Sequence, residues 1–249
     1  MAFGLTNAPA SMQRLMDKCL DEALNSYAIA YLDDIIIYSD TPESHLKHLD
    51  YVLKQLHKFG LRISLAKCEF FKSEIIFLGH LIRYGEISID PTKIEGIKHM
   101  PAPTDVKSLM RVLGVFGWSR RFIMNYSSIS APLTDLLRTK AQWVWGPAQN
   151  EAFQSLKARL VESPVLVQPE FGREFILETD ASDYGIGAVL GQHDARGGLR
   201  PVSFRSRKLT SAEKNYSTRE KEALAVWSVE KLSQFLSFTI ITDHRSLCG

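Results

Sequence analysis

Apolar residues recur at helical spacing near the start of the chain and are followed by short β-rich runs. Over residues 9–24 the apolar side chains share one helical face and a proline lies in the first turn, which predicts a packed helix. Residues 28–32 and 35–38 are apolar runs separated by two acidic residues, which predicts a β-hairpin with a tight acidic turn. A second helix is predicted over residues 41–60, from a Thr-Pro pair to a glycine.

The middle of the chain combines helical patterns with proline punctuation. Residues 70–89 are β-rich and interrupted by glycines, which predicts a hairpin, and the Asp-Pro pair that follows caps a short predicted helix. A Pro-Ala-Pro sequence at residues 101–103 marks a boundary. Further helices are predicted over residues 104–140 and 148–161.

The last part of the chain has the pattern of a mixed sheet. Residues 173–192 predict a strand, a glycine-rich turn and a second strand, and residues 201–208 predict a third strand. A helix is predicted over residues 217–235 and a fourth strand over residues 238–242. The strand–helix–strand crossover is expected to lay the fourth strand parallel beside the first.

Three carboxylates of this last part are expected to meet at one end of the sheet. Asp180 and Asp243 follow the apolar runs of the first and fourth strands. Glu222 lies on the apolar stripe of the helix, where an uncompensated charge is costly. Three carboxylates suit Mg²⁺, which prefers oxygen ligands. The alternative is a buried glutamate paired with a lysine or arginine, beside two exposed aspartates.

Asp33 and Asp34 form a second acidic site between two apolar runs. A carboxylate beside buried strand costs several kcal/mol unless it is solvated, paired or bound to a cation. The pair therefore suggests a metal, although acidic residues are also common in turns that have no other role.

Composition is that of a folded protein with no overall electrostatic bias. The chain has 249 residues, of which 45% are hydrophobic and 23% charged, and its net charge is +2. This is enough for two or three compact units, and the overall charge does not indicate a nucleic-acid partner. A central basic stretch is the exception, and either phosphate binding or a solvated helix face explains it equally well. Its members are Lys107, Arg111, Arg120, Arg121, Arg138 and Lys140.

Cysteine spacing and hydropathy indicate a soluble, intracellular protein. Cys19, Cys68 and Cys248 match neither a disulfide framework nor a zinc motif, and no apolar run is long enough to span a membrane. His45 and His48 lie one helical turn apart, but without a third ligand they are expected to be ordinary surface residues.

Several motifs in a fixed order resemble the reverse transcriptases of gypsy-class long-terminal-repeat retrotransposons. The resemblance covers essentially the whole chain and therefore is far more specific than an Asp-Asp pair alone. The matching segments are residues 1–13, 31–34, 68–70, 77–80, 120–123, 131–133, 175–182, 215–225 and 242–244.

The resemblance implies an α+β fold, namely the C-terminal part of a right-hand polymerase palm with thumb, followed by a ribonuclease H-like α/β domain. It implies a palm with primer grip at residues 1–100 and a thumb at 101–140. It implies a connection at 141–170 and a C-terminally truncated ribonuclease H-like domain at 171–249. Residues 115–119 depart from the family, which commonly has a Tyr-Tyr pair there.

The resemblance also assigns roles in DNA synthesis. Asp33 and Asp34 match two of three carboxylates that hold two Mg²⁺ ions, and Tyr31 lies beside the primer end. The matching residues of the nucleotide pocket are Phe3, Gly4 and Asn7. The third carboxylate is expected upstream of this sequence, so the chain is expected to begin at a truncation.

For the nuclease, the resemblance implies Asp180, Glu222 and Asp243 as the catalytic, metal-binding carboxylates, again with two Mg²⁺ ions. The family's fourth carboxylate has no counterpart before Gly249. The implied partners are an RNA template, a DNA primer, an RNA–DNA hybrid and deoxynucleoside triphosphates, without a membrane, in a cytoplasmic virus-like particle.

Taken alone, this chain is expected to fail in polymerisation and to cleave a hybrid weakly or not at all. The main alternative is a catalytically inactive retroelement remnant that at most binds nucleic acid. A host metal nuclease with only the ribonuclease H fold conflicts with residues 31–34 and the palm-like order.

Overall fold

A computed structural model describes residues 7–139, 141–233 and 238–241. The chain divides into two compact units, Met1–Phe71 and Lys72–Gly249. We call them the N-terminal unit and the C-terminal unit, and each is described by itself.

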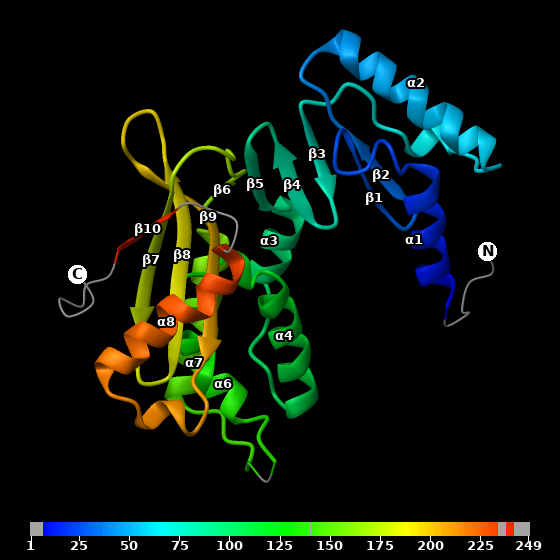
Figure 1. Cartoon of the computed structure of the whole chain (residues 1–249). Coiled ribbons are helices and arrows are strands. Elements are labelled where there is room, and N and C mark those ends of the chain that lie inside the picture. Colours follow the sequence, from blue (N-terminus) through cyan, green and yellow to red (C-terminus); the bar gives the residue numbers. More distant parts are fainter. Residues whose placement is uncertain (1–6, 140, 234–237, 242–249) are drawn as a thin grey trace. The chain divides into compact units, whose positions relative to one another are not determined.

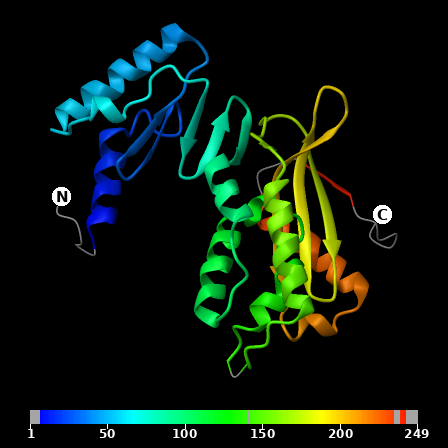
Figure 2. The ribbon, with the colours of Figure 1, turned by 180° about the vertical axis from the view of Figure 1, so that it is seen from behind.

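The N-terminal unit is a two-stranded hairpin packed against two helices (Figures 1 and 2). Its elements are α1 (Ala8–Cys19), β1 (Ala28–Tyr31), β2 (Asp34–Ile37), α2 (Pro42–Lys58) and the short 3₁₀ helix η1 (Leu65–Lys67). Met16 and Cys19 of α1 are buried with Val52 and Leu56 of α2, and Ala28 of β1 joins them. Burial of this one face holds the hairpin to both helices.

The C-terminal unit begins with an antiparallel sheet in the order β3-β4-β5-β6. Its strands are β3 (Glu74–Phe77), β4 (His80–Arg83), β5 (Glu86–Ile89) and β6 (Leu166–Val167). The helices that follow β5 are α3 (Pro91–Lys98), α4 (Val106–Trp118), η2 (Arg120–Phe122), α5 (Tyr126–Ile129), α6 (Ala131–Asp135) and α7 (Pro147–Val161). Their shared core contains Phe116 and Phe153, whose ring centroids are 5.9 Å apart.

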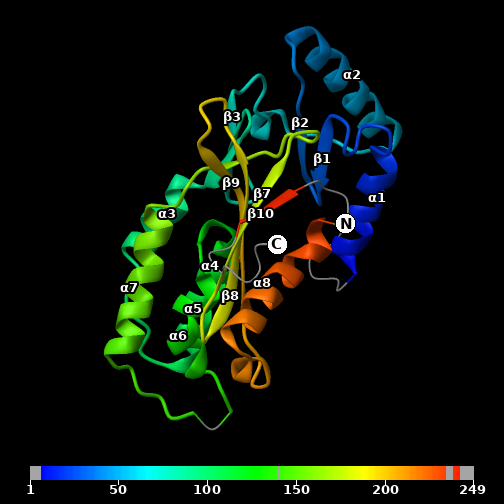
Figure 3. The same cartoon turned by 60° about the vertical axis from the view of Figure 1, so that its left-hand side comes forward.

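A second sheet of this unit has the order β10-β7-β8-β9. Its strands are β7 (Phe175–Ala181), β8 (Gly185–His193), β9 (Leu199–Lys208) and β10 (Phe238–Ile241), with η3 (Glu213–Asn215) and α8 (Thr218–Ser233) between the last two. The predicted parallel pairing of the first and fourth strands is confirmed, since Phe238 pairs with Phe175 and Ile241 with Glu178. Figure 3 shows α8 on one side of this sheet and α5, α6 and α7 on the other.

The alternation of side chains assigns residues to the two faces of this sheet. Ala181 and Ile186 are register partners and pack with Ala225 of α8. Asp180 and Gly187 are also register partners, so their side-chain positions lie on the opposite face, toward α5.

Two predicted elements differ from those observed, and one observed strand was not predicted. The first helix ends at Cys19 rather than residue 24, because the carbonyl of Ala23 accepts the N–H groups of Tyr27 and Ala28 in a tight turn. The hairpin predicted over residues 70–89 is three strands. The two-residue strand β6 was not predicted, because its partner β5 is remote in sequence.

Among the residues that the structure describes, no helix has both the length and the apolar character needed to cross a membrane.

Candidate carboxylate centres and an arginine-lined hollow

The hairpin of the N-terminal unit presents Asp33 and Asp34 at its tip. Tyr31 pairs with Asp34, so the turn consists of Leu32 and Asp33 and is shifted by one residue from the predicted Asp-Asp turn. Both aspartates are exposed and adjacent, which leaves their carboxylates accessible to a cation. Leu32 adopts φ 56°, an uncommon conformation for a residue with a branched side chain.

Gln13 of α1 fixes this tip and was not identified from the sequence. Its Oε1 accepts the N–H of Leu32 at 2.8 Å, and its Nε2 donates to the carbonyl of Ala30 at 3.2 Å and to Asp17 at 2.8 Å. One side chain therefore bonds to the main chain on the approach to Asp33 and within the turn. Gln13 ends the matching segment 1–13, but its helical position alone does not indicate a contact with the hairpin.

The predicted nucleotide-pocket residues are only partly described. Asn7 is the exposed N-cap of α1, and its carbonyl accepts the N–H of Ser11 at 3.0 Å. Tyr31 is half exposed, next to the turn that carries Asp33. Phe3 and Gly4 lie outside the described residues.

His45 and His48 are half-buried rather than freely exposed as expected. Their Nδ1 atoms lie 3.2 Å and 2.7 Å from the Ser39 hydroxyl, and the ring of His48 stacks on Tyr27 with centroids 3.8 Å apart. They hold the start of α2 against the hairpin strands.

Asp180 and Glu222 bond to neighbouring groups near the end of β7, from opposite faces of the sheet. Oε1 of Glu222, a side chain that is only 4% exposed, accepts the N–H of Ala181 at 3.1 Å. The predicted placement of Glu222 on the sheet-facing side of its helix thus agrees with its burial. Asp180, the preceding residue of β7, is half-buried, and its Oδ2 accepts Nδ2 of Asn125 at 2.7 Å.

Asp183 and Glu220 have hydrogen-bond partners at the start of α8. Lys221 donates to Asp183 at 2.8 Å, and this bond lowers the pKa of Asp183. A capping box begins α8, since Glu220 accepts the N–H of Ser217 at 2.8 Å and Ser217 Oγ accepts the N–H of Glu220 at 3.3 Å.

Asp243 lies outside the described residues. Within residues 7–139, 141–233 and 238–241, no three His, Cys, Asp or Glu side chains form a group that could hold a metal ion. The described part of each centre therefore offers two carboxylates.

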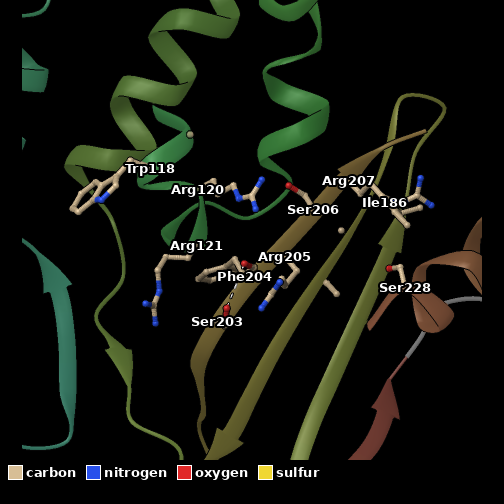
Figure 4. Close-up of a pocket in the computed structure, with 13 residues that line it drawn as sticks. Trp118, Arg120, Arg121, Ile186, Ser203, Phe204, Arg205, Ser206, Arg207 and Ser228 are labelled. Carbon is tan, nitrogen blue, oxygen red and sulfur yellow. Dashed lines mark hydrogen bonds between the residues drawn. The ribbon is translucent and has the colours of Figure 1, made fainter. Parts of the chain in front are cut away.

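A hollow of about 790 Å³ in the C-terminal unit is lined by arginines from two elements (Figure 4). Arg120 and Arg121 come from η2, whereas Arg205 and Arg207 come from β9, the edge strand of the second sheet. Arg207 pairs with Glu213 at 2.9 Å. Among the described residues, no carboxylate forms an ion pair with the other three. Burial, and then the neighbouring charge of Arg205, lowers the pKa of Arg121.

Of the six basic residues singled out from the sequence, Arg120 and Arg121 line the hollow, and Lys140 lies outside the described residues. Arg138 pairs with Asp135, and Lys107 and Arg111 are exposed on α4. Arg205 and Arg207 were missed because strand alternation alone does not show which edge a strand occupies. The guanidinium groups of Arg120, Arg121 and Arg205, which line one opening and pair with no described carboxylate, are suited to an anion.

A cluster of aromatic and basic side chains adjoins Arg121. Trp118 is 39% exposed, with Lys93 Nζ 4.1 Å from its ring centroid and the ring of His80 at 4.5 Å. Burial, followed by Arg121 and Lys93, lowers the pKa of His80, so its imidazole is neutral at pH 7. Gly79 has φ 78°, and a Cβ there would overlap the ammonium group of Lys93.

Two family models match the chain in the order that the sequence motifs predict. Residues 1–82 match the reverse transcriptase (RNA-dependent DNA polymerase) family, and residues 145–242 match the RNase H-like domain found in reverse transcriptase. Each segment is therefore similar to one of these two enzymatic families.

Over nearly its full length the chain is similar to polyproteins of retrotransposons. It is 40% identical over 252 residues to the retrovirus-related Pol polyprotein from transposon 297 of Drosophila melanogaster, covering 99% of the chain and 23% of the relative. It is 36% identical over 255 residues to the Tf2-3 polyprotein of Schizosaccharomyces pombe, covering 100% of the chain and 19% of the relative. The resemblance to retrotransposon Pol is thus confirmed, and the gypsy class is consistent with these names.

Solved structures confirm the predicted fold class. The foamy viral protease-reverse transcriptase dRH in complex with double-stranded DNA matches with a TM-score of 0.83 and 23% identity, over 97% of this chain and 43% of that chain. The foamy viral protease-reverse transcriptase in complex with RNA/DNA hybrid matches with a TM-score of 0.80 and 22% identity, over 98% of this chain and 33% of that chain.

Proposed function

We propose that this chain is part of an enzyme that synthesises DNA on an RNA template and cleaves the RNA of the resulting hybrid. One observation carries the proposal: each matched family segment contains its own carboxylate site, Asp33-Asp34 in the first and Asp180 with Glu222 in the second. The chain spans 19–26% of the length of the first relatives, so the activity of the whole protein is itself part of the proposal.

For DNA synthesis, Asp33 and Asp34 are the proposed ligands of two Mg²⁺ ions. Their exposed carboxylates provide the hard oxygen donors that Mg²⁺ prefers. Bound there, the ions would neutralise charge that develops during phosphoryl transfer. Tyr31 borders the primer end in this proposal, and Phe3, Gly4 and Asn7 contribute to a deoxynucleoside triphosphate pocket.

For hybrid cleavage, Asp180, Glu222 and Asp243 are the proposed ligands, also with two Mg²⁺ ions. The fit rests on the donor chemistry of Asp180 and Glu222, whose hydrogen bonds involve the adjacent residues 180 and 181 of β7. Buried carboxylates beside main chain are unfavourable unless bonded or bound to a cation. The N–H of Ala181 fixes one oxygen of Glu222, which orients the rest of the group.

The arginine-lined hollow is the proposed contact for the phosphates of RNA, DNA or their hybrid. Arg120, Arg121 and Arg205 offer charge that no described carboxylate neutralises, and the exposed ring of Trp118 offers a surface for stacking. Phosphate contacts fix the register of a nucleic acid without reading its sequence. This property suits an enzyme that must copy any template.

The domain limits and the location are also proposed. Residues 1–100 are assigned to palm and primer grip, 101–140 to thumb, 141–170 to connection and 171–249 to the nuclease. β6 of the proposed connection pairs with β5 of the proposed palm, which ties these segments together. The site of action is a cytoplasmic virus-like particle.

Cleavage of a labelled hybrid tests the proposal. The purified chain is incubated with Mg²⁺ and an RNA–DNA hybrid, alongside Asp180→Asn and Glu222→Gln, with Asp183→Asn as a matched control and single-stranded RNA as a control substrate. Weak cleavage of the hybrid alone, lost in the first two variants and kept in the third, supports the proposal. A hybrid cut equally by Asp180→Asn contradicts the proposed role of Asp180. A hybrid left intact by the folded chain favours the alternative, an inactive remnant that at most binds nucleic acid.

A further inference from the structure

Asn125 connects the helical segment before α5 to the nuclease strand. It is separated from Asp180 by 55 positions, and its Nδ2 donates to Oδ2 of Asp180 at 2.7 Å. Residues on this face of the sheet, including Asp180, point away from α8 and toward α5. The amide of Asn125 therefore reaches the carboxylate from the side opposite Glu222.

Gly187 provides the space in which this amide lies. It is the register partner of Asp180 in β8, and a Cβ built at its position would overlap Oδ1 of Asn125. The next heavy atom outside Asn125 is the carbonyl oxygen of Asp180, at an ordinary 3.8 Å. The absence of a side chain at 187 is thus required by Asn125 rather than by the strand itself.

The backbone around Asn125 is held in place by α5. Asn125 has φ 56°, in the left-handed region that asparagine tolerates better than most residues. The N–H of Ser127 donates to Ser206 at 3.0 Å, and the hydroxyls of Ser128 and Ser182 are 2.9 Å apart. The residues that follow Asn125 are therefore bonded to β9 and to the turn after β7.

We propose that Asn125 is a positioning residue that holds the Asp180 carboxylate in the orientation needed to bind a divalent cation. The inference rests on the proposed function of Asp180. A carboxylate has about four acceptor sites, so one bond to Oδ2 leaves Oδ1 available. Hydrogen-bonded partners of this kind restrict the rotation of a ligand and strengthen its binding to the metal.

Asn125→Gly is the sharpest variant, because glycine adopts the left-handed backbone readily and only the side chain is lost. Mg²⁺ affinity is measured by calorimetric titration of the whole chain. The expected result is binding weaker by about 10-fold, the low end of the effect of losing such a partner. Ser128→Ala removes a different contact between α5 and the sheet and is expected to keep the wild-type affinity.

Coupling between Asn125 and Gly187 provides a readout independent of any metal. Gly187→Ala is expected to lower the Tm in the wild-type background, because its Cβ collides with the amide. In the Asn125→Gly background the same change is expected to leave the Tm nearly unaltered. Equal losses in both backgrounds would overturn the packing argument.

Asp180→Asn separates failure of the inference from failure of the proposed function. Suppose that Asp180→Asn abolishes a Mg²⁺ site. If the affinity of that site in Asn125→Gly is equal to or higher than its affinity in Ser128→Ala, the inference is wrong. If Asp180→Asn leaves Mg²⁺ binding unchanged, the proposed metal centre itself fails, and the inference fails with it.

Discussion

The conformation of Leu32 shows how a single side chain sets the shape of the first carboxylate site. A left-handed backbone costs a non-glycine residue on the order of 1 kcal/mol or more, so the surrounding structure must favour it. Gln13 does so by accepting the N–H of Leu32 and donating to Ala30. The exposed position of Asp33 therefore depends on an amide in a neighbouring helix.

Replacing Gln13 by alanine should loosen the hairpin tip. The loss of one hydrogen bond to the Leu32 N–H is expected to lower the free energy of unfolding by about 1 kcal/mol. Hydrogen exchange of the Leu32 amide should accelerate in Gln13→Ala. Asp17→Ala removes only the outer partner of Gln13 and should leave this exchange unchanged. An unaltered rate in Gln13→Ala would show that Gln13 does not hold the turn.

Glu213 supports the arginine-lined hollow through a pH-dependent ion pair. Two bonds from Arg207, at 2.9 Å and 3.0 Å, and the N–H of Thr210 lower the pKa of Glu213 from its ordinary 4.5 to about 2. A lowered pKa stabilises the fold above pH 4.5, and this contribution is lost as the pH falls from 4.5 toward about 2.

Glu213→Gln is therefore expected to destabilise the protein at pH 7, by about 1 kcal/mol for a pair that solvent partly screens. The difference from wild type should shrink as the pH is lowered through this window and vanish near its lower end. Urea unfolding at a series of pH values measures this difference in the free energy of unfolding between Glu213→Gln and wild type. Glu162→Gln, an exposed change at the end of α7, is the control. A difference that stays constant with pH would contradict the pKa assignment.

At the scale of elements, local sequence patterns were sufficient to predict most helices and strands. The hairpin, α2, α7, α8 and the parallel pairing of β10 follow from periodicity, caps and the crossover rule. β6 was not predicted, because two residues are too few to show the alternation of a strand and the pairing partner is distant in sequence. The acids of the candidate sites could be identified by type, whereas Gln13 and Asn125 could not, since their roles depend on tertiary contacts.

Arg205 of the edge strand β9 is predicted to contribute to nucleic-acid binding. Arg205→Ala should weaken the binding of an RNA–DNA hybrid and reduce the slope of affinity against salt by about 1, as expected for one lost phosphate contact. Arg196→Ala, in the turn between β8 and β9 and outside the hollow, is the matched control. Equal effects of the two changes would mean that charge in general, and not the hollow, attracts the nucleic acid. Fluorescence anisotropy at several salt concentrations gives both quantities.

At the scale of the whole molecule, the chain consists of two units that are joined by an exposed segment. The first unit ends at Phe71, and Arg62, Lys67 and Lys72 near this limit are all exposed. Few buried apolar contacts form in such a stretch, so it opens at low cost in free energy.

Limited trypsin digestion should therefore cut first at residues 62–72. Mass spectrometry is expected to find a resistant C-terminal fragment that begins at residue 63, 68 or 73. The sheet β10-β7-β8-β9 lies entirely within this fragment, so its β-sheet circular dichroism should persist. First cuts within α7 or β9, both of which contain tryptic sites, would show that the division into two units is wrong.

The central claim is that one chain carries two separate carboxylate sites for divalent cations. Electron paramagnetic resonance of Mn²⁺, a stand-in for Mg²⁺, measures the uptake of the ion by the wild-type chain, by Asp33→Asn with Asp34→Asn, and by Asp180→Asn. The account predicts two independent classes of site, with the double variant losing one class and Asp180→Asn losing the other. Uptake that is unchanged in both variants would contradict it.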